Sequence, residues 1–325
     1  MRDDAILAWH LAPLKDLMAA EDATELVINR PCEIGLERTG QWSWHEAPDL
    51  TADWLRTLAV AAAAHTGQDV SDAHPICSTT LPGDERCQIV LPPVSPSVSL
   101  TIRKPSRTNA SLADFAAGGL FEDVVAAGQR DEVTARLVAL HDRKDWVAFF
   151  DTAVKARRNI LVSGATGSGK TTFAKGLIQS IPLEERLLTI EDTREFVVPH
   201  RNVVHMVYAR DGQSLSEVGA GALLESALRM RPDRILLQEL RDRSAFFFLR
   251  NIASGHPGSI TTIHADSAAG AFDNLALLIR ESEAGRELPA EDVRRLLRSL
   301  VDIVVQMKKI EGRFRVTEVW HEPER

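Results

Sequence analysis

The chain has 325 residues, which is enough for two domains of ordinary size, each with its own core. Hydrophobic residues make up 44% and charged residues 26%, the balance of a soluble globular protein rather than of a disordered or fibrous one. A formal net charge of -8 argues against non-specific binding to DNA or RNA, because that affinity comes mostly from neutralisation of phosphates by Lys and Arg. We therefore expect no strong nucleic-acid binding.

The cysteines and the apolar segments indicate the cellular compartment. Cys32, Cys77 and Cys87 form no CxxC pair, and three cysteines in a chain of this size are typical of reduced thiols in the cytosol. The first residues lack the pattern of a secretory signal, and the longest apolar run, 58–64, is far shorter than the roughly 20 residues that span a bilayer. We expect a cytoplasmic protein, with peripheral contact to the inner face of a membrane left open.

Residues 1–104 are predicted to form a smaller N-terminal α+β domain. Its one long helix is expected at 51–67, where Thr51 is a candidate N-cap and Gly67 a candidate C-terminal stop. Short runs with alternating polarity, bounded by turn residues, indicate the strands of a mixed sheet. These strands are expected at 24–30, 33–38, 42–47, 86–90 and 97–104.

The last of these strands has a regular alternation. Val98, Leu100 and Ile102 are apolar and lie between polar residues, which predicts one buried face and one polar face. Arg103 ends the polar face.

A helical linker is predicted at 105–145. Helical patterns at 111–120, 132–141 and 144–158 are interrupted by glycines. A segment of this length between two sheets is too long to be a bare loop, so we interpret it as a linker built of short helices.

From 146 to 325 strands alternate with helices, which predicts an α/β domain with a mainly parallel sheet. The expected strands are 159–164, 186–192, 234–240, 259–264, 303–310 and 314–320. The expected helices are 170–180, 222–230, 267–283 and 289–300.

The stretch GATGSGKT, residues 164–171, matches the pattern GxxxxGK[ST] and lies between a predicted strand and a predicted helix. Glycines let successive backbone N–H groups point inward around phosphate oxygens, and the helix N-terminus adds a partial positive charge. We expect Lys170 to contact the β- and γ-phosphates of ATP and the Thr171 hydroxyl to coordinate Mg²⁺. The predicted nucleotide-binding residues are Gly164, Ala165, Thr166, Gly167, Ser168, Gly169, Lys170, Thr171 and Thr172.

Two further strands end in acids. Glu191 and Asp192 follow one, and in an open α/β sheet such positions face the ligand crevice, beside a metal ion or an attacking water. Glu239 follows Gln238 inside an otherwise apolar strand, where a carboxylate is desolvated unless a metal or a base compensates. A solvated loop charge remains the alternative for each.

Two histidines lie in the stretch 254–267. His264 ends a strand and His256 lies in a Gly/Pro-rich turn. A histidine at a strand end is more often a hydrogen-bonded structural residue than a sensor. We expect no metal site from this pair, because no third ligand stands at the usual spacing.

These motifs, in this order and separation, resemble those of the traffic ATPases of type IV secretion systems, within the larger family of secretion and pilus assembly ATPases. The motor motifs are the P-loop, TIEDTREF, ALRMRPDRILLQEL and SGHPGSITTIHADS; INRP, CSTTLPGDERCQI and LPPVSPSVSLTIRKPS are similar to the family's N-terminal domain. The resemblance implies a RecA-like motor domain, a PAS-like N-terminal domain and a homo-hexameric ring with ATP held between the two domains. It also implies partners among the inner-membrane components of a secretion channel.

The resemblance also implies roles by position. Glu191 matches the acidic box, Glu239 the acid at the end of the second ATPase strand, and His264 the histidine box. In this reading Glu239 would polarise the attacking water and Glu191 would support the water or the metal. Arg103 matches an N-terminal arginine that reaches the nucleotide phosphates. Arg229 and Arg231 are weaker candidates for contacts across the ring, since arginines at a helix end equally form a solvated face.

The chain departs from the family at Gln238, where the family usually has glycine, and its linker is long. Three alternatives stay open: a pilus retraction or type II secretion motor, a RecA-like nucleic-acid motor, and a nucleotide-gated scaffold that does not hydrolyse ATP. The chain has no cysteine after Cys87, whereas type II motors of the extension class typically carry a four-cysteine zinc site. The amphipathic stretch 290–301 is interpreted as a solvated helix face, with contact to anionic lipid as its alternative.

Overall fold

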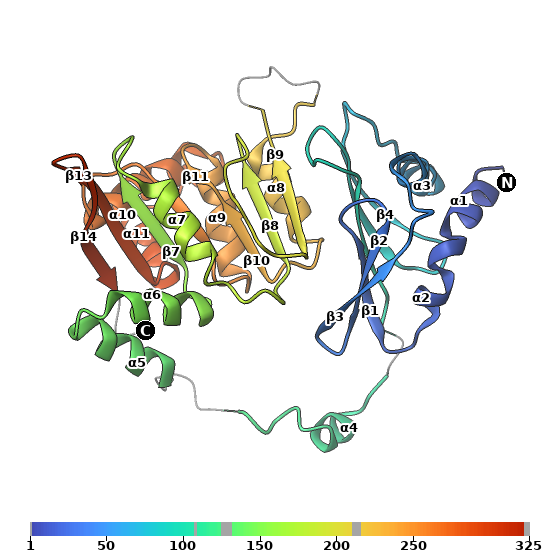
Figure 1. The fold of residues 1–325 in the computed structure, drawn as a ribbon, viewed down its shortest axis with the longest axis horizontal. Helices are drawn as coiled ribbons and strands as arrows, with labels where there is room; N and C mark the ends of the chain where they lie inside the picture. The colour runs from blue at the N-terminus through green and yellow to red at the C-terminus, as the bar shows by residue number, and fades with distance from the viewer. Residues whose placement is uncertain (1, 107–108, 125–131, 210–215, 322–325) are drawn as a thin grey trace.

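The computed structural model describes residues 2–106, 109–124, 132–209 and 216–321. Figure 1 shows an N-terminal domain and a larger α/β domain, joined by a segment that carries helix α4. Among the described residues no helix is both long and apolar enough to cross a membrane.

The N-terminal domain is a six-stranded antiparallel sheet in the order β3-β2-β1-β6-β5-β4, with helices packed against one face. Its strands are β1 (Ala23–Ile28), β2 (Glu33–Arg38), β3 (Gln41–Glu46), β4 (Ile76–Thr80), β5 (Arg86–Val90) and β6 (Ser99–Arg103). Its helices are α1 (Arg2–Leu11), the 3₁₀ turn η1 (Ala12–Leu14), α2 (Lys15–Ala19) and α3 (Ala52–His65).

The long helix forms where the sequence predicts it. The Thr51 side chain accepts a hydrogen bond from the backbone N–H of Trp54 at 3.2 Å, which confirms the N-cap. Leu55 and Leu58 are buried against the sheet, each contributing about 1.5–3 kcal/mol of hydrophobic stabilisation. Elements α1, η1, α2 and β4 were not predicted: α1 packs on α3, and β4 is paired along its whole length with β5.

The polar face of β6 is buried instead of facing solvent. Ser99 and Thr101 are as inaccessible as their apolar neighbours, and only Arg103 is exposed. Thr101 Oγ1 accepts a hydrogen bond from Arg186 of the α/β domain at 3.1 Å. The alternation in the sequence does mark two faces of β6, as predicted. The apolar face packs in the core of the N-terminal domain, and the polar face lies against the α/β domain instead of solvent.

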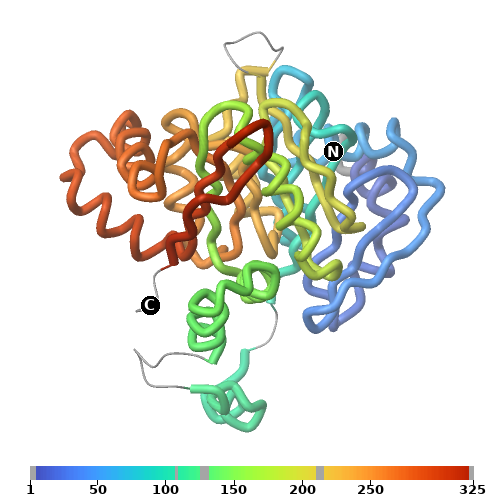
Figure 2. The backbone as a smooth tube through the Cα atoms, turned by 60° about the vertical axis from the view of Figure 1, so that its left-hand side comes forward, coloured from blue at the N-terminus to red at the C-terminus, as the bar shows by residue number. Residues whose placement is uncertain are grey.

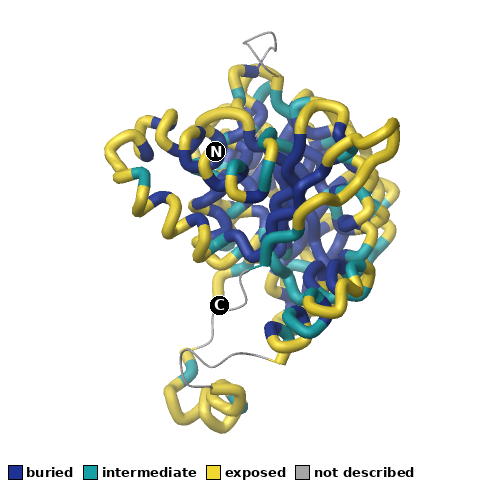
Figure 3. Tube along the Cα trace, turned by 90° about the vertical axis from the view of Figure 1, so that its left-hand side faces the viewer, coloured by how far each residue is buried: buried dark blue, intermediate teal, exposed yellow. Residues whose placement is uncertain are grey.

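The linker divides into two unlike parts. Helix α4 (Leu112–Ala117) begins with a capping box between Ser111 and Asp114, and its side chains lie outside all three hydrophobic cores of the described residues. Helix α5 (Glu132–Asp142) packs with α6 (Trp146–Lys155) on the α/β domain, where Leu137 and Leu140 are buried. Figure 3 shows the contrast, with α4 exposed and the strands buried. The boundaries at 104 and 145 stay predictions, and α5 shares the core of the larger domain.

The α/β domain contains two sheets that lie edge to edge. One has the order β10-β8-β9 and the other β11-β12-β7-β13-β14, and the Thr262 N–H joins them by donating to Gln238 O at 3.2 Å. All neighbouring pairs are parallel except β13 with β14, so the mainly parallel sheet is confirmed. The strands are β7 (Ile160–Gly164), β8 (Leu187–Glu191), β9 (Val203–Val207), β10 (Arg234–Leu237), β11 (Glu239–Leu240), β12 (Ile260–Ile263), β13 (Ile303–Ile310) and β14 (Arg313–His321).

Helices cover both faces of these sheets. Helices α5, α6 and α7 (Lys170–Ile178) share one hydrophobic core with the strands. The other core contains α8 (Ala220–Ala227), α9 (Ser244–Ala253), α10 (Ala268–Glu281) and α11 (Ala290–Leu300). The sequence did not predict β9 or α9. In α9 three consecutive phenylalanines, Phe246–Phe248, obscure the spacing of apolar residues that marks a helix. Strand β9 forms because it pairs with β8, a contact that the local sequence does not reveal.

The interface between the two domains has an apolar part, where Val90 and Val94 of the N-terminal domain join a hydrophobic core of the larger domain, and a set of hydrogen bonds. Arg186, which is fully buried, donates to Asn29 Oδ1 at 2.8 Å as well as to Thr101. Gln88 Nε2 donates to Ser226 Oγ at 2.9 Å, and the Val207 N–H donates to Val94 O at 2.7 Å. The N-terminal domain therefore covers β9 and the start of β8, and not the P-loop end of β7.

Candidate active site

The P-loop joins β7 to α7 at the carboxyl end of the central strand. β7 is paired on one side with β12 and on the other with β13. A Cβ at Gly164 would lie 2.5 Å from the backbone oxygen of Met307, and Gly169 has a φ of +92°, so both positions require glycine. This turn presents the N-terminus of α7, the arrangement that binds phosphate in P-loop proteins.

Lys170 lies folded across the loop. Its Nζ donates to Gly164 O at 2.8 Å and to Ala165 O at 3.0 Å, and it lies 3.4 Å from Nδ1 of His264. Burial lowers the pKa of Lys170, and the Glu239 carboxylate opposes that shift. The ammonium is therefore held at the mouth of the loop, next to two of the predicted catalytic residues.

The other predicted loop residues surround this point. Ser168 Oγ is buried and has no hydrogen-bond partner within the described protein, so a phosphate oxygen would satisfy it. Thr171 is half-buried at the start of α7 and Thr172 is exposed beside it. Loop, lysine and hydroxyls together fit a nucleotide phosphate chain, and Thr171 is the hydroxyl placed to hold a metal ion with it.

Glu239, the first residue of β11, and His264, which follows β12, lie together. His264 Nε2 is 2.6 Å from Glu239 Oε1, while its Nδ1 faces Lys170. Burial and then the Lys170 ammonium lower the pKa of His264, which favours the neutral imidazole. With Nδ1 accepting from Lys170, the ring proton belongs on Nε2 and points to the carboxylate.

Arg241 belongs to the same cluster and was missed in the sequence. It contacts Oε2 of Glu239, and its Nη1 lies 3.4 Å from Asp192 Oδ2. The sequence singles out Gln238 and Glu239 just before it, but nothing local distinguishes Arg241 itself. Only the fold brings the residues that follow β8 and β11 together. A continuous set of polar contacts thus runs from Asp192 through Arg241, Glu239 and His264 to Lys170.

Glu191 has another environment from the one expected. It is fully buried, and its Oε2 accepts from the backbone N–H groups of Glu195 at 2.7 Å and Phe196 at 2.8 Å. Burial by itself raises the pKa of Glu191, but these bonds and those from His205 and Thr189 hold it below its usual value. Glu191 thus shapes the turn after β8, and Asp192 is the acid of that pair that reaches the Glu239 cluster.

Gln238, between β10 and β11, connects β8 with β12. Its backbone N–H donates to Ile190 O at 3.0 Å, its backbone O accepts from Thr262, and its side-chain Oε1 accepts from the Asp192 N–H at 3.3 Å. The side chain that replaces the family's glycine is therefore bound to a neighbouring backbone group.

The predicted arginines lie elsewhere in the chain. Arg103 is 65% exposed and its Nε is 3.4 Å from Glu25 Oε1. Burial raises the pKa of Glu25 to about 7, against the opposing effects of Arg103, Arg231 and Arg186. Glu25 lies near all three arginines, and Arg186 and Arg231 come just before β8 and β10, at the amino ends of those strands. Arg103 therefore lies at the opposite end of the sheet from the P-loop, which follows the carboxyl end of β7. The structure does not bring it to the loop of its own chain.

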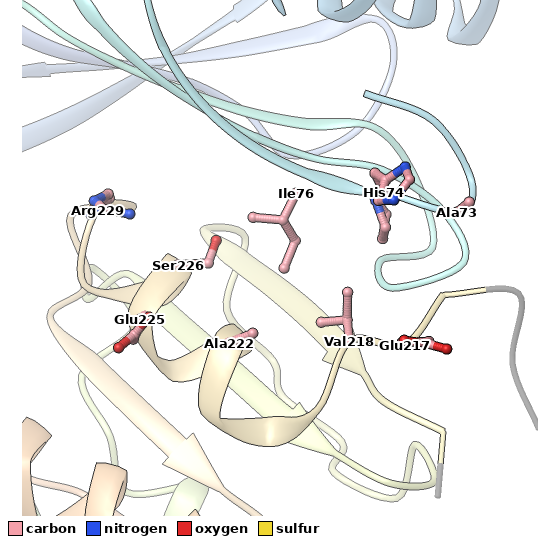
Figure 4. A pocket seen from close by; sticks show the side chains of 10 residues that line it. Ala73, His74, Ile76, Glu217, Val218, Ala222, Glu225, Ser226 and Arg229 are labelled. Atoms are coloured by element: carbon pink, nitrogen blue, oxygen red, sulfur yellow. The ribbon is translucent and has the colours of Figure 1, made fainter. Parts of the chain in front are cut away.

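Arg229 and Arg231 contact the N-terminal domain of the same chain. Arg231 Nη2 is 3.7 Å from Glu37, and Arg229 Nη1 donates to Ser78 Oγ at 3.3 Å. Figure 4 shows Arg229 at one end of a cavity of about 560 Å³ between the domains, with Ile76 on the N-terminal side and Val218 on α8's side. Both arginines therefore take part in the domain interface.

Comparison with known proteins identifies the family. Residues 54–310 match the family described as "Type II/IV secretion system protein". The chain is 49% identical to the type IV secretion system protein VirB11 of Bartonella quintana (strain Toulouse), over 98% of this chain and 94% of that protein. It is 42% identical to VirB11 of Brucella suis biovar 1, over 98% of this chain and 91% of that protein.

A solved structure has the same fold. The crystal structure of the VirB11 ATPase from the Brucella suis type IV secretion system, in complex with sulphate, matches with a TM-score of 0.93. It is 41% identical and 98% of each chain is covered. The resemblance seen in the motifs is confirmed: the chain belongs to the Type II/IV secretion system protein family and is a traffic ATPase of type IV secretion systems.

Proposed function

We propose that this ATPase works as a ring of six identical subunits, in which ATP hydrolysis moves the N-terminal domains against inner-membrane components of the secretion channel. In this proposal the larger domain is a RecA-like motor and the smaller one is PAS-like. The buried hydrogen bonds and apolar contacts between the two domains support such coupling, because they make the N-terminal domain follow a movement of the larger domain. The ring would lie in the cytoplasm, in peripheral contact with the inner face of the bacterial inner membrane.

One observation carries the catalytic part of the proposal: at the P-loop His264 contacts Lys170 through one ring nitrogen and Glu239 through the other. Bound Mg²⁺ supplies charge neutralisation at the β- and γ-phosphates of ATP. Thr171 would hold the metal, and Lys170 would leave its loop carbonyls for the phosphates. Glu239 would then accept hydrogen bonds from the attacking water and orient it.

The remaining residues support that site. His264 contacts both Glu239 and Lys170, so movement of the lysine toward phosphate would shift His264 and with it the Glu239 carboxylate. Glu191 keeps the turn that presents Asp192, and Arg241 orients Glu239 from its other oxygen. Arg103 lies at the opposite end of the sheet from the P-loop of its own chain, so we assign it to the nucleotide of a neighbouring subunit. An arginine supplied in this way is worth about 10³-fold or more in rate.

Two variants test the site. Lys170→Ala should lose ATP binding and turnover together, because the phosphates lose their principal cation. Glu239→Gln should bind ATP with about the parent affinity and release phosphate at least ~100-fold more slowly, since the amide is a poor acceptor for the water's proton. Equilibrium binding and phosphate release measure the two steps separately. Undiminished hydrolysis by Glu239→Gln would remove this residue from the reaction.

The ring is tested by light scattering with and without ATP. A mass of six chains is expected, and Arg103→Ala should keep that mass while lowering turnover. Mixing Lys170→Ala chains with Arg103→Ala chains should give more activity than either variant alone if each residue serves a different subunit's site. Failure of the mixture to exceed both variants would place Arg103 outside the reaction.

A further inference from the structure

The β13–β14 hairpin extends past the edge of the sheet where the P-loop lies. Met307 of β13 is paired with Gly164, the last residue of β7, so residues 308–315 lie beyond that strand's end. Glu311 and Gly312, with φ of 50° and 77°, close the hairpin. In Figure 2 the hairpin, in dark red, lies against the green segment that holds β7 and α7. The catalytic cluster described above makes no use of these residues.

Phe314 of this hairpin rests on the P-loop. A Cβ added to Gly169 would lie 2.9 Å from Phe314 Cγ, which means that the ring lies directly against the glycine. The side chain is nevertheless 53% exposed, so much of the ring is open. Lys309 is its cross-strand partner, and the Lys309 Nζ lies 6.0 Å from the ring centroid. A phenylalanine that only braced the loop would gain more by being covered on both faces.

A mainly apolar groove begins one turn of α7 beyond Gly169, at Phe173, whose backbone N–H donates to Gly169 O. Val316 is two residues from Phe314 on β14 and therefore points to the same face, and it lines the groove together with Phe173 of α7. The groove has a volume of about 720 Å³ and continues between α6 and α7 past Phe150 and Leu177. An aromatic ring, a lysine and an apolar wall thus lie together within one helical turn of the P-loop.

We propose that Phe314 is the stacking platform for the purine base of the nucleotide, with Lys309 beside it and the Val316–Phe173 end of the groove receiving the base edge. The inference rests on the proposed binding of ATP phosphates to residues 164–171. The base is the part of ATP that leaves the loop, and its flat apolar face suits an open phenyl ring that has no hydrogen-bonding group. The hairpin therefore contributes to affinity for the base and takes no part in the chemical step.

The test compares ATP with inorganic tripolyphosphate, which has the phosphates but no base. Phe314→Ala should weaken ATP binding about tenfold or more and leave tripolyphosphate binding unchanged, with KM for ATP raised and kcat kept within about twofold. Phe314→Trp should restore ATP affinity, and its fluorescence should respond to ATP but not to tripolyphosphate. Phe115→Ala, which removes an exposed phenylalanine of α4, is the matched control and should bind both ligands as the parent does.

The outcomes separate this inference from the proposed function. Lys170→Ala should lose both ligands, and if it keeps them the P-loop proposal fails whatever Phe314 does. If Phe314→Ala weakens ATP and tripolyphosphate equally, Phe314 only braces the loop and the base subsite is wrong. Unchanged ATP affinity in Phe314→Ala would overturn it as well.

Discussion

Gln238, the residue before the predicted catalytic acid Glu239, has a structural role that the motif does not reveal. In place of the glycine usual in the family, this chain has an amide whose Oε1 accepts from the Asp192 N–H, and the backbone of the same residue joins β8 to β12. The residue therefore stiffens the edge on which Glu239 stands. A glycine at this position would leave the backbone bonds in place and remove only the side-chain bond.

We predict that Gln238→Gly keeps or raises ATP turnover and lowers the free energy of unfolding by about 1–2 kcal/mol. The loss comes from one hydrogen bond and from the greater freedom of glycine in the unfolded chain. Urea unfolding and phosphate release measure the two effects, and Gln238→Ala separates the lost bond from the backbone freedom. A tenfold fall in turnover with unchanged stability would show that the amide acts in catalysis.

At the scale of elements, β14 connects the nucleotide end of the domain with α5 and α6. Its first residues lie at the P-loop, and its last, His321, packs against Phe149 of α6 and His141 of α5, with ring centroids 5.5 Å and 6.1 Å away. Burial, then His141 and Arg158, lower the pKa of His321 to about 4. The neutral ring is thus the form that the packed helices accept.

A pH dependence of stability follows from this packing. Because the folded pKa lies below the unfolded value of about 6.5, the unfolded chain binds more protons as the pH falls, and the stabilisation present above pH 6.5 is lost toward pH 4. Allowing for partial exposure, we expect His321 to contribute about 1 kcal/mol to this loss. Urea unfolding at pH 7 and pH 5 should show a smaller pH effect in His321→Phe. The exposed His74→Phe control should behave as the parent; equal slopes in all three proteins would contradict the assignment.

For the whole molecule, the decisive feature is the interface between the two domains. Arg186 is fully buried there and donates to Asn29, Asn202, Thr101 and the backbone O of Met230. A buried guanidinium with all its partners in two domains fixes their relative position, because separating them leaves several polar groups unsatisfied.

We predict that Arg186→Leu destabilises the protein by about 3–5 kcal/mol and releases the N-terminal domain from the larger one. Limited proteolysis should then cut the linker faster, and thermal unfolding should separate into two transitions. Arg201→Ala removes an exposed pair with Glu33 at the same interface and should cost less than about 1 kcal/mol. Similar losses in both variants would show that the buried network has no special part in holding the domains.

The sequence alone determined the elements whose physical signal is local. The P-loop needs glycines and a lysine at fixed spacing, α3 needs a cap and an apolar stripe, and the parallel sheet follows from alternating strands and helices. These signals lie within a few residues of each other, so no distant contact is required to recognise them. The acids and the histidine of the site were found for the same reason, as polar residues that end apolar strands.

Only the tertiary structure decided which of these residues meet. Arg241 enters the site because the residues after β8 and β11 come together in the fold. Glu191 is held away from the cluster by hydrogen bonds from nearby backbone N–H groups, and Arg103 lies at the far end of the sheet. The polar face of β6 and the place of Phe314 likewise depend on surfaces more than 80 residues distant in the chain. Such contacts are set by sheet order and domain packing, which leave no local trace in the sequence.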